Sequence, residues 1–275
     1  MICKICNSTT KIVSNQLVLN KYKVDYHQCS TCHFIQTDEP YWLAESYENA
    51  ITALDIGLVS RNIYLQNVIP PIIEMCFPEA KVMIDYAGGY GMFVRMMRDL
   101  GYNFYRQDIY CENLFANYFD LKDCPVKKVD IVTAFEVFEH LHHPIEEIGK
   151  MFELSDNIVF STVLSPSDIN EFHDWWYVSP LIGQHISFYD LTTLSYIAVK
   201  FGKKLYSNGN NLHVFTSSNI DAKTIEKLFG SNKNRILKKL ETSFTNRPMA
   251  TRKRESLLES DYKYISNKLS KNEKI

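Results

Sequence analysis

A glycine-rich turn behind a short apolar run constrains the fold of this chain more than any other feature. Residues 82–94 read Val-Met-Ile-Asp-Tyr-Ala-Gly-Gly-Tyr-Gly-Met-Phe-Val. Glycine has no Cβ and accepts positive φ, so the chain can turn sharply there and a ligand can approach the backbone. The N–H groups that open the following helix point into the same space. The stretch therefore predicts a strand, a tight turn and a helix that together bind a nucleotide.

The turn by itself leaves the kind of nucleotide open. A dinucleotide site reads Gly-x-Gly-x-x-Gly, but in the frame of Gly89 and Gly91 the third position is Val94. Asp108 ends a second expected strand and could accept both hydroxyls of a ribose, which NAD and S-adenosylmethionine (SAM) share. SAM has a methionine ammonium group where NAD has a pyrophosphate, and Asp85 is well placed to bind that ammonium. The pattern favours SAM over a nicotinamide cofactor.

Strand-like and helix-like segments alternate through the middle of the chain. We expect strands at 81–86, 103–108, 129–135 and 157–162, and helices at 91–100, 111–117 and 144–153. Such alternation predicts a parallel sheet with helices on both faces. A helix at 190–201 should precede a hairpin at 204–216 that turns at Asn208-Gly209-Asn210-Asn211. An antiparallel hairpin should therefore close the sheet.

Three segments, in this order and spacing, resemble the class I SAM-dependent methyltransferases. They are 85–91, Asp108, and 130–144 with its Glu139-His140-Leu141 block, and the resemblance covers residues 80–217. It implies an α/β, Rossmann-like fold whose seven-stranded sheet ends in an antiparallel hairpin. Ala87 stands where the family usually has its first loop glycine. The SAM-binding residues that the resemblance implies are Asp85, Tyr86, Ala87, Gly88, Gly89, Gly91, Asp108, Ile109, Phe135 and Glu136.

Four of the seven cysteines form two closely spaced pairs near the beginning of the chain. Cys3-x-x-Cys6 and Cys29-x-x-Cys32 suit tetrahedral coordination of a structural zinc ion by thiolates. The alternating residues 13–24 between them are compatible with a small hairpin. A vestigial or redox-active arrangement of the two Cys-x-x-Cys pairs is the alternative. We favour a coordinatively closed zinc ribbon that holds a short module together.

Composition changes along the chain and suggests four regions. We expect a zinc-ribbon module at 1–40, a helical bridge or lid at 41–80, the SAM-binding domain at 81–220 and a basic helical tail at 221–275. Residues 222–275 hold 14 Lys and Arg against 6 Asp and Glu. The tail could be a solvated appendage, a dimer contact or a surface for an anionic partner, although it lacks the interleaved aromatic residues of a base-stacking surface.

An aromatic segment lies between the strand 157–162 and the helix 190–201. In open α/β sheets, ligands bind outside the carboxyl ends of the strands, so this loop could form the wall of an acceptor pocket. Its side chains could equally cover the edge of the core. The residues that we name as tentative acceptor contacts are Trp175, Trp176 and Tyr177.

Transfer of a methyl group to a hydroxyl requires a group that removes the proton. We favour His185 as the general base, because residues 183–189 resemble a segment of zinc-module methyltransferases from surface-sugar gene clusters. His140 is the second candidate, since the Glu139-His140-Leu141 block faces the methyl donor in that family.

The resemblance points to methylation of a hydroxyl or phosphate-type oxygen on a small-molecule acceptor that is either a sugar or nucleotide-linked. We expect a sugar or a phosphorylated precursor of capsule or other surface polysaccharide. The alternatives are an RNA or protein methyltransferase, a nucleic-acid-binding module that uses the ribbon and the basic tail, and, disfavoured, an NAD-dependent oxidoreductase. No apolar run approaches the roughly 20 residues that span a bilayer, and no signal segment is evident, so we expect a cytoplasmic protein. The sequence leaves the oligomeric state open.

Overall fold

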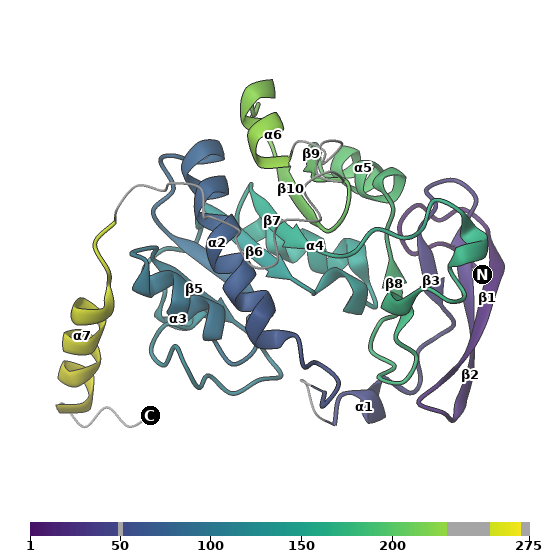
Figure 1. Cartoon of the computed structure of the whole chain (residues 1–275), viewed down its shortest axis with the longest axis horizontal. Helices are drawn as coiled ribbons and strands as arrows, with labels where there is room; N and C mark the ends of the chain where they lie inside the picture. Colours follow the sequence, from purple (N-terminus) through teal and green to yellow (C-terminus); the bar gives the residue numbers. More distant parts are fainter. Residues whose placement is uncertain (49–51, 230–253, 271–275) are drawn as a thin grey trace, which may run out of the picture. The chain divides into compact units, whose positions relative to one another are not determined.

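The computed structural model describes residues 1–48, 52–229 and 254–270, whose elements are labelled in Figure 1. The chain divides into two compact units. Unit 1 consists of Met1–Ile56 and Ala134–Ser231, and unit 2 of Gly57–Thr133 and Asn232–Ile275. The boundaries expected at residues 40, 80 and 220 remain predictions, and residues 230–253 and 271–275 of the expected tail lie outside the described residues.

A mixed six-stranded sheet confirms the expected α/β, Rossmann-like class. Its strands are β4 (Met83–Tyr86), β5 (Phe104–Gln107), β6 (Ile131–Phe135), β7 (Ile158–Ser161), β9 (Lys204–Ser207) and β10 (Leu212–Thr216), in the order β5-β4-β6-β7-β10-β9. β4 runs parallel to β5 and β6, whereas β10 runs antiparallel to β7 and β9. The closing hairpin is therefore confirmed. The described residues form the six strands that the alternation predicts, one fewer than the resemblance implies.

Unit 2 contains the helices α2 (Leu58–Cys76) and α3 (Met92–Asp99). α2 continues through Pro70 and Pro71. Both prolines are buried with the apolar face of α2, and packing of such a face outweighs local propensity.

The helix expected at 111–117 was wrong. Side chains compete with helical hydrogen bonds in this segment, because Asp108 accepts the N–H groups of Tyr110 and Cys111, and Asn113 accepts that of Ala116. Short Asp and Asn side chains stabilise such turns at the expense of a helix. The segment after β5 is consequently a series of turns that ends in a short 3₁₀ helix, Leu121–Asp123.

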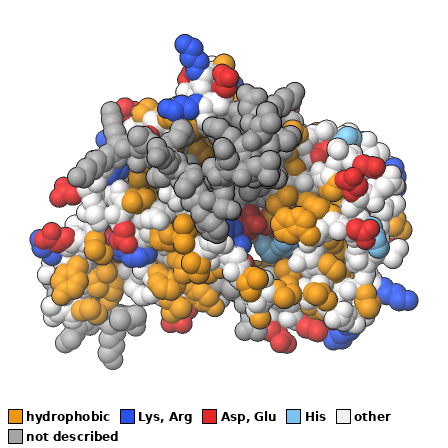
Figure 2. All heavy atoms as spheres, in the orientation of Figure 1, with side chains coloured by type: hydrophobic (Ala, Val, Ile, Leu, Met, Phe, Trp, Pro, Cys, Tyr) orange, Lys and Arg blue, Asp and Glu red, His pale blue; other side chains and the backbone are white. Residues whose placement is uncertain are grey.

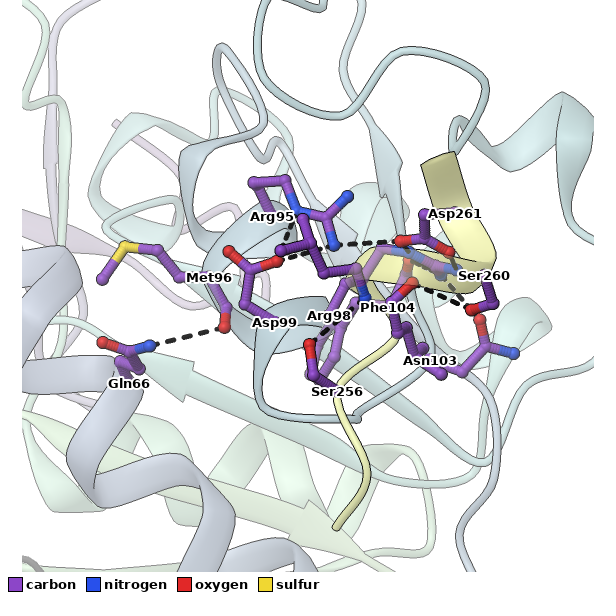
Figure 3. Close-up of polar contacts among 12 residues, drawn as sticks. Gln66, Arg95, Met96, Arg98, Asp99, Asn103, Phe104, Ser256, Ser260 and Asp261 are labelled. Carbon is purple, nitrogen blue, oxygen red and sulfur yellow. Dashed lines mark hydrogen bonds and ion pairs between the residues drawn. The ribbon is translucent and has the colours of Figure 1, made fainter. Parts of the chain in front are cut away.

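Part of the basic tail is not a solvated appendage but a docked helix. Within unit 2, α7 (Leu258–Ser270) contributes Asp261, which is buried and accepts hydrogen bonds from Arg98 and Arg95 of α3 (Figure 3). Arg98 uses its Nε and Nη2 atoms on the two carboxylate oxygens, at 2.8 and 2.7 Å. A bidentate pair of this kind fixes orientation as well as position.

Unit 1 contains a second sheet, which confirms the hairpin expected near the cysteines. It consists of β1 (Thr10–Val18), β2 (Tyr22–Cys29), β3 (Ile35–Thr37) and β8 (Ser187–Phe188), in this order. The last strand comes from the aromatic segment, far along the chain. The other helices of unit 1 are α1 (Leu43–Ser46), α4 (Pro144–Leu154), α5 (Leu191–Lys200), α6 (Ala222–Phe229) and the 3₁₀ helices Phe138–His140, Ile169–Glu171 and Trp176–Val178.

One hydrophobic core joins the ribbon sheet to the aromatic segment within unit 1. Tyr26 of β2 and Trp42 pack in the same buried cluster as Phe172, Tyr177 and Phe188. The indole N–H of Trp42 donates to the carbonyl of Gly183 at 2.8 Å. The cysteine module therefore supports the segment in which we expected the acceptor site. Among the described residues, we find no helix that combines the length and the hydropathy needed to cross a bilayer.

Candidate functional site

The glycine loop of unit 2 connects β4 to α3 and has a strained backbone. Ala87, Gly89 and Gly91 adopt φ values of 54°, 55° and 84°. Gly91 is the N-cap of α3, and its N–H donates to the carbonyl of Gly88 at 3.0 Å. Glycine accepts such angles at little cost, whereas alanine does not. Ala87 thus takes the left-handed conformation even though it departs from the family pattern.

Asp85 lies beneath this loop with its carboxylate buried. Thr133 of β6 donates its hydroxyl to Asp85 Oδ1 at 2.7 Å. Burial, and to a smaller extent the charge of Asp108, raises the pKa of Asp85 to about 7. A Cβ atom at Gly88 would lie 2.7 Å from Asp85 Oδ2. A side chain at residue 88 would occupy the space of Oδ2, so glycine at this position lets the carboxylate lie against the loop.

Asp108, which follows β5, holds the glycine loop to the next turn. Its Oδ2 accepts the N–H of Gly89 at 2.9 Å, and its Oδ1 accepts those of Tyr110 and Cys111 at 2.8 and 2.7 Å. A carboxylate oxygen offers two lone pairs. Of these three bonds, Oδ2 accepts one, so its second lone pair can accept one more donor at the edge of the loop.

Arg106 is a residue of this site that the sequence reasoning missed. Its buried guanidinium donates to the carbonyl of Gly89 and, at 2.9 Å, to that of Cys111, and it pairs with Asp120 at 2.7 Å. The guanidinium therefore links the glycine loop to the segment that follows β5. The available signal was a charged residue inside an expected buried strand, since such residues are rarely buried without partners.

The side chains next to Asp108 face outward. Figure 2 shows hydrophobic side chains on the face of unit 2 that carries α2 and α3. Ile109 and Tyr110 are among the exposed hydrophobic residues, with 77% and 71% of their surfaces accessible. Ile109, one of the predicted SAM contacts, therefore presents an apolar side chain to solvent directly after Asp108.

A second group of polar residues lies in unit 1, and we call it the histidine cluster: Glu136, Glu139, His140, Tyr177 and His185. Glu139 is fully buried and accepts the Tyr177 hydroxyl on Oε1 at 2.6 Å. Its Oε2 is also buried and has no hydrogen-bond partner among the described residues. Burial, reinforced by the charge of Glu136, raises the pKa of Glu139 to about 8.

Glu136 belongs to the same cluster and has a strained backbone, with φ of 54°. Its Oε1 accepts the Ser161 hydroxyl at 2.6 Å, and its N–H donates to Ser161 Oγ at 2.9 Å. Strain of this kind is often retained at functional sites. Phe135, the other SAM contact predicted here, ends β6 directly before it.

Backbone carbonyl groups orient both histidines of the cluster. The Nδ1 atom of His185 lies 2.5 Å from the Tyr177 carbonyl oxygen, and that of His140 lies 3.1 Å from the Gln184 carbonyl oxygen. A carbonyl oxygen only accepts, so each Nδ1 carries a proton, and the neutral form of each ring has its lone pair on Nε2. The ring centroids are 4.9 Å apart. The structure therefore brings together the two residues that we predicted as candidate bases.

The predicted acceptor contacts have three different environments. Tyr177 is buried in the histidine cluster, and Trp175 packs against the core beneath the ribbon sheet. Trp176 exposes 73% of its surface. Tyr47, which sequence reasoning did not single out, brings its hydroxyl within 3.0 Å of His140 Nδ1.

The four N-terminal cysteines form one compact cluster in unit 1. Cys3 Sγ lies 3.5 Å from Cys32 Sγ, and Cys6 Sγ lies 3.3 Å from Cys29 Sγ, while all four sulfur atoms lie within 4.8 Å of one another. The shortest contacts join the two Cys-x-x-Cys motifs and do not fall within either one, which favours a shared ion over a redox disulfide. Thiolates around zinc lie about 3.8 Å apart, given bonds of about 2.3 Å.

The surroundings of the sulfur atoms also fit a metal ion. Backbone N–H groups of Ile5 and Thr31 point at Cys3 Sγ and Cys29 Sγ, at 3.4 and 3.3 Å. The hydrogen bond between the two thiols lowers the pKa of Cys3 to about 5 and raises the pKa of Cys32. The backbone N–H groups stabilise thiolates, which are the form that binds zinc.

Comparison with protein-family models identifies the type of domain. A family model described as a methyltransferase domain matches residues 62–208. No curated protein sequence matches the chain. Among solved structures, magnesium protoporphyrin IX methyltransferase from Synechocystis PCC 6803, with bound SAH, aligns with 64% of this chain and 93% of its own, at 12% identity and a TM-score of 0.43.

Two further solved structures are similar to a comparable part of the chain. An O-methyltransferase family protein from Burkholderia thailandensis aligns with 66% of this chain and 64% of its own, at 12% identity and a TM-score of 0.40. TnmH aligns with 64% of this chain, at 13% identity and a TM-score of 0.44. The match spans 61% of TnmH, which is less than two thirds of that protein.

Proposed function

We propose, from the premise that this chain belongs to the methyltransferase-domain family, that it transfers the methyl group of SAM to an oxygen atom of a small-molecule acceptor. The observation that carries the proposal is the buried carboxylate of Asp85 directly beneath a loop that has no Cβ at Gly88. An anionic group beside exposed backbone suits the ammonium and carboxylate of a methionine moiety better than a pyrophosphate, which Asp85 would repel.

The residues of unit 2 would hold the donor at two points. Asp85 would bind the ammonium group, and below a pH of about 7 the arriving cation would also displace a proton. Oδ2 of Asp108, which retains one lone pair beyond the loop bonds, would accept a ribose hydroxyl. When bound, SAM supplies a methyl group on a positively charged sulfur. Tyr86, Ala87, Gly89, Gly91 and Ile109 are the further SAM contacts that we propose in unit 2, and Phe135 and Glu136, the other two predicted contacts, belong to unit 1.

The residues of unit 1 would act on the acceptor. His185 is oriented by the Tyr177 carbonyl with its lone pair on Nε2, which is the form that a general base requires. His140 has the same tautomer and is the second candidate. In-line methyl transfer needs mainly correct placement of the two reacting groups and removal of one proton.

We further propose that the acceptor is a sugar or a phosphorylated precursor of capsule or surface polysaccharide. The support is the resemblance of residues 183–189 to zinc-module methyltransferases of surface-sugar clusters and the exposed indole ring of Trp176, on which a sugar could stack. A structural zinc ion in the four-cysteine module and a cytoplasmic location are parts of the same proposal. Nothing in the docked helix α7 favours the nucleic-acid alternative, since its Asp261 pairs with arginines of α3.

Substitution Gly88→Ala tests the proposed donor site. The backbone of residue 88 does not have positive φ, but the added Cβ would displace the Asp85 carboxylate, which Thr133 holds in place. We expect the dissociation constant for S-adenosylhomocysteine, measured by titration calorimetry, to rise at least about tenfold, which corresponds to about 1.4 kcal/mol.

Gly149→Ala is the matched control, because a Cβ at Gly149 in α4 makes only ordinary contacts, the nearest at 3.8 Å. Alanine is also the better helix former. This variant should bind the ligand like the parent protein. Equal affinity of the Gly88→Ala variant and the parent would show that the ligand does not use this loop.

A further inference from the structure

We propose that Glu139, His140 and His185 form a site for one divalent transition-metal ion, distinct from the four-cysteine site. One carboxylate oxygen and one ring nitrogen from each histidine lie within 4.8 Å of one another. Ligand atoms at about 2.0–2.2 Å from an ion are at most about 4.4 Å apart. A small movement of one side chain would therefore bring all three atoms into coordination distance.

The buried carboxylate of Glu139 is an independent reason to expect a ligand here. Glu139 is completely buried, and Tyr177 satisfies only its Oε1 atom. Oε2 has no hydrogen-bond partner among the described residues. Leaving a buried polar atom unsatisfied is costly, and groups of this kind call for an explanation such as a bound ion.

The orientation of the two histidines is also that of metal ligands. Histidines that bind metal ions commonly donate their other N–H to a backbone carbonyl or a carboxylate, which fixes the tautomer and the direction of the ring. His140 and His185 both donate from Nδ1 to backbone carbonyls, those of Gln184 and Tyr177. Tyr177 thus orients two of the three ligands, His185 through its carbonyl and Glu139 through its hydroxyl.

The donor set indicates which class of ion would bind. Two imidazole nitrogens and one carboxylate suit Mn²⁺, Fe²⁺, Co²⁺ or Zn²⁺, whereas Mg²⁺ and Ca²⁺ prefer oxygen donors. Three protein ligands on one side of an ion leave positions for an oxygen of another molecule. The four-cysteine cluster differs in both respects, since its sulfur donors close a tetrahedron.

The inference rests on the proposed function and changes the role of His185 within it. An ion at this site would lower the pKa of a coordinating acceptor hydroxyl, as it does for bound water. The proton passes to solvent, the acceptor oxygen bonds to the methyl carbon, and the carbon–sulfur bond breaks with its electron pair on sulfur. His185 would then serve as a ligand, and direct proton abstraction by His185 is the competing outcome.

Binding of Mn²⁺ to protein whose four-cysteine module already holds zinc tests the site without any turnover. Free Mn²⁺ is counted by its electron paramagnetic resonance signal as the ion is titrated in. We expect one Mn²⁺ per chain. Glu139→Gln and His185→Ala should each weaken binding at least about tenfold. His143→Ala, an exposed histidine in the same segment, should leave binding unchanged.

The titrations are run on samples whose near-ultraviolet circular dichroism matches that of the parent protein. Glu139→Gln preserves the shape and the acceptor for the Tyr177 hydroxyl, and His185→Ala provides the second variant in case the first fails to fold. No stoichiometric Mn²⁺ binding by the parent protein, or equal binding by the folded variants, overturns the inference. Titration of S-adenosylhomocysteine into the same samples separates this result from a failure of the proposed function, which would remove binding of that ligand.

Discussion

The substitution Cys32→Ser is expected to release the zinc ion proposed for the four-cysteine module and to unfold the sheet built on it. Cys32 is buried and lies 3.5 Å from Cys3, so no solvent or other side chain can replace the lost thiolate without rearrangement. Structural zinc contributes about 10–16 kcal/mol of apparent binding energy to small modules. Loss of one ligand should therefore cost more than any single substitution in the apolar core.

Loss of zinc should also disturb the histidine cluster. Tyr177 packs in the hydrophobic core beside the ribbon sheet, and its hydroxyl donates a hydrogen bond to Glu139. Zinc content, measured by elemental analysis, should fall by at least one ion per chain. Amide exchange in β1, β2 and β8 should become fast. Cys124→Ser, which lies outside the cluster, is the control and should retain the ion. Retention of zinc and of slow exchange by Cys32→Ser would contradict the expectation.

The second large effect is expected for Asp261→Ala in α7. Figure 3 shows the carboxylate of Asp261 between the side chains of Arg95 and Arg98. Arg98 is buried and stacks over the ring of Phe119 at 3.7 Å, so its guanidinium would keep a charge in an apolar site without a carboxylate. Removing one partner of a buried ion pair costs about 3–5 kcal/mol of unfolding free energy.

Urea denaturation of the whole protein, with hydrogen exchange of the amides of unit 2 as the local probe, measures this loss of unfolding free energy. Asp99→Ala is the matched control, because Asp99 also pairs with Arg95, at 2.9 Å, but on the exposed side of α3. Pairs of that kind contribute no more than about 0.5 kcal/mol. A double-mutant cycle with Arg98→Ala isolates the pair itself. Equal losses for Asp261→Ala and Asp99→Ala would show that α7 does not depend on this contact.

The sequence predicted those elements whose patterns are local. The apolar strand before Gly88, the glycine turn and the Asn-Gly hairpin turn depend on neighbouring residues, and each was found where its pattern placed it. Glu139, His140 and His185 were likewise within the segments that we singled out. Their convergence could be expected because the loops after neighbouring strands meet at one edge of a sheet.

The features that sequence reasoning missed depend either on side chains that compete with local helical hydrogen bonds or on partners far away in the chain. The helix expected at 111–117 was replaced by turns because Asp108 and Asn113 bind backbone N–H groups there. Arg98 and Asp261 are 163 residues apart, so no periodicity could reveal their pairing. β8 joins the ribbon sheet across a similar distance along the chain. Apolar and polar patterns record that a residue is buried, but they do not record what covers it.

The central claim is that the glycine loop binds SAM, and a thermal-shift comparison of four ligands tests it most directly. SAM, S-adenosylhomocysteine, NAD and NADP are added separately to the same protein at equal concentrations. A ligand that binds only the folded state stabilises it by about 2.7 kcal/mol at 100 times its dissociation constant, so binding is easily seen as a rise in Tm. We predict that SAM and S-adenosylhomocysteine raise the Tm and that NAD and NADP do not. A rise with a nicotinamide cofactor and none with either adenosyl ligand would contradict the account.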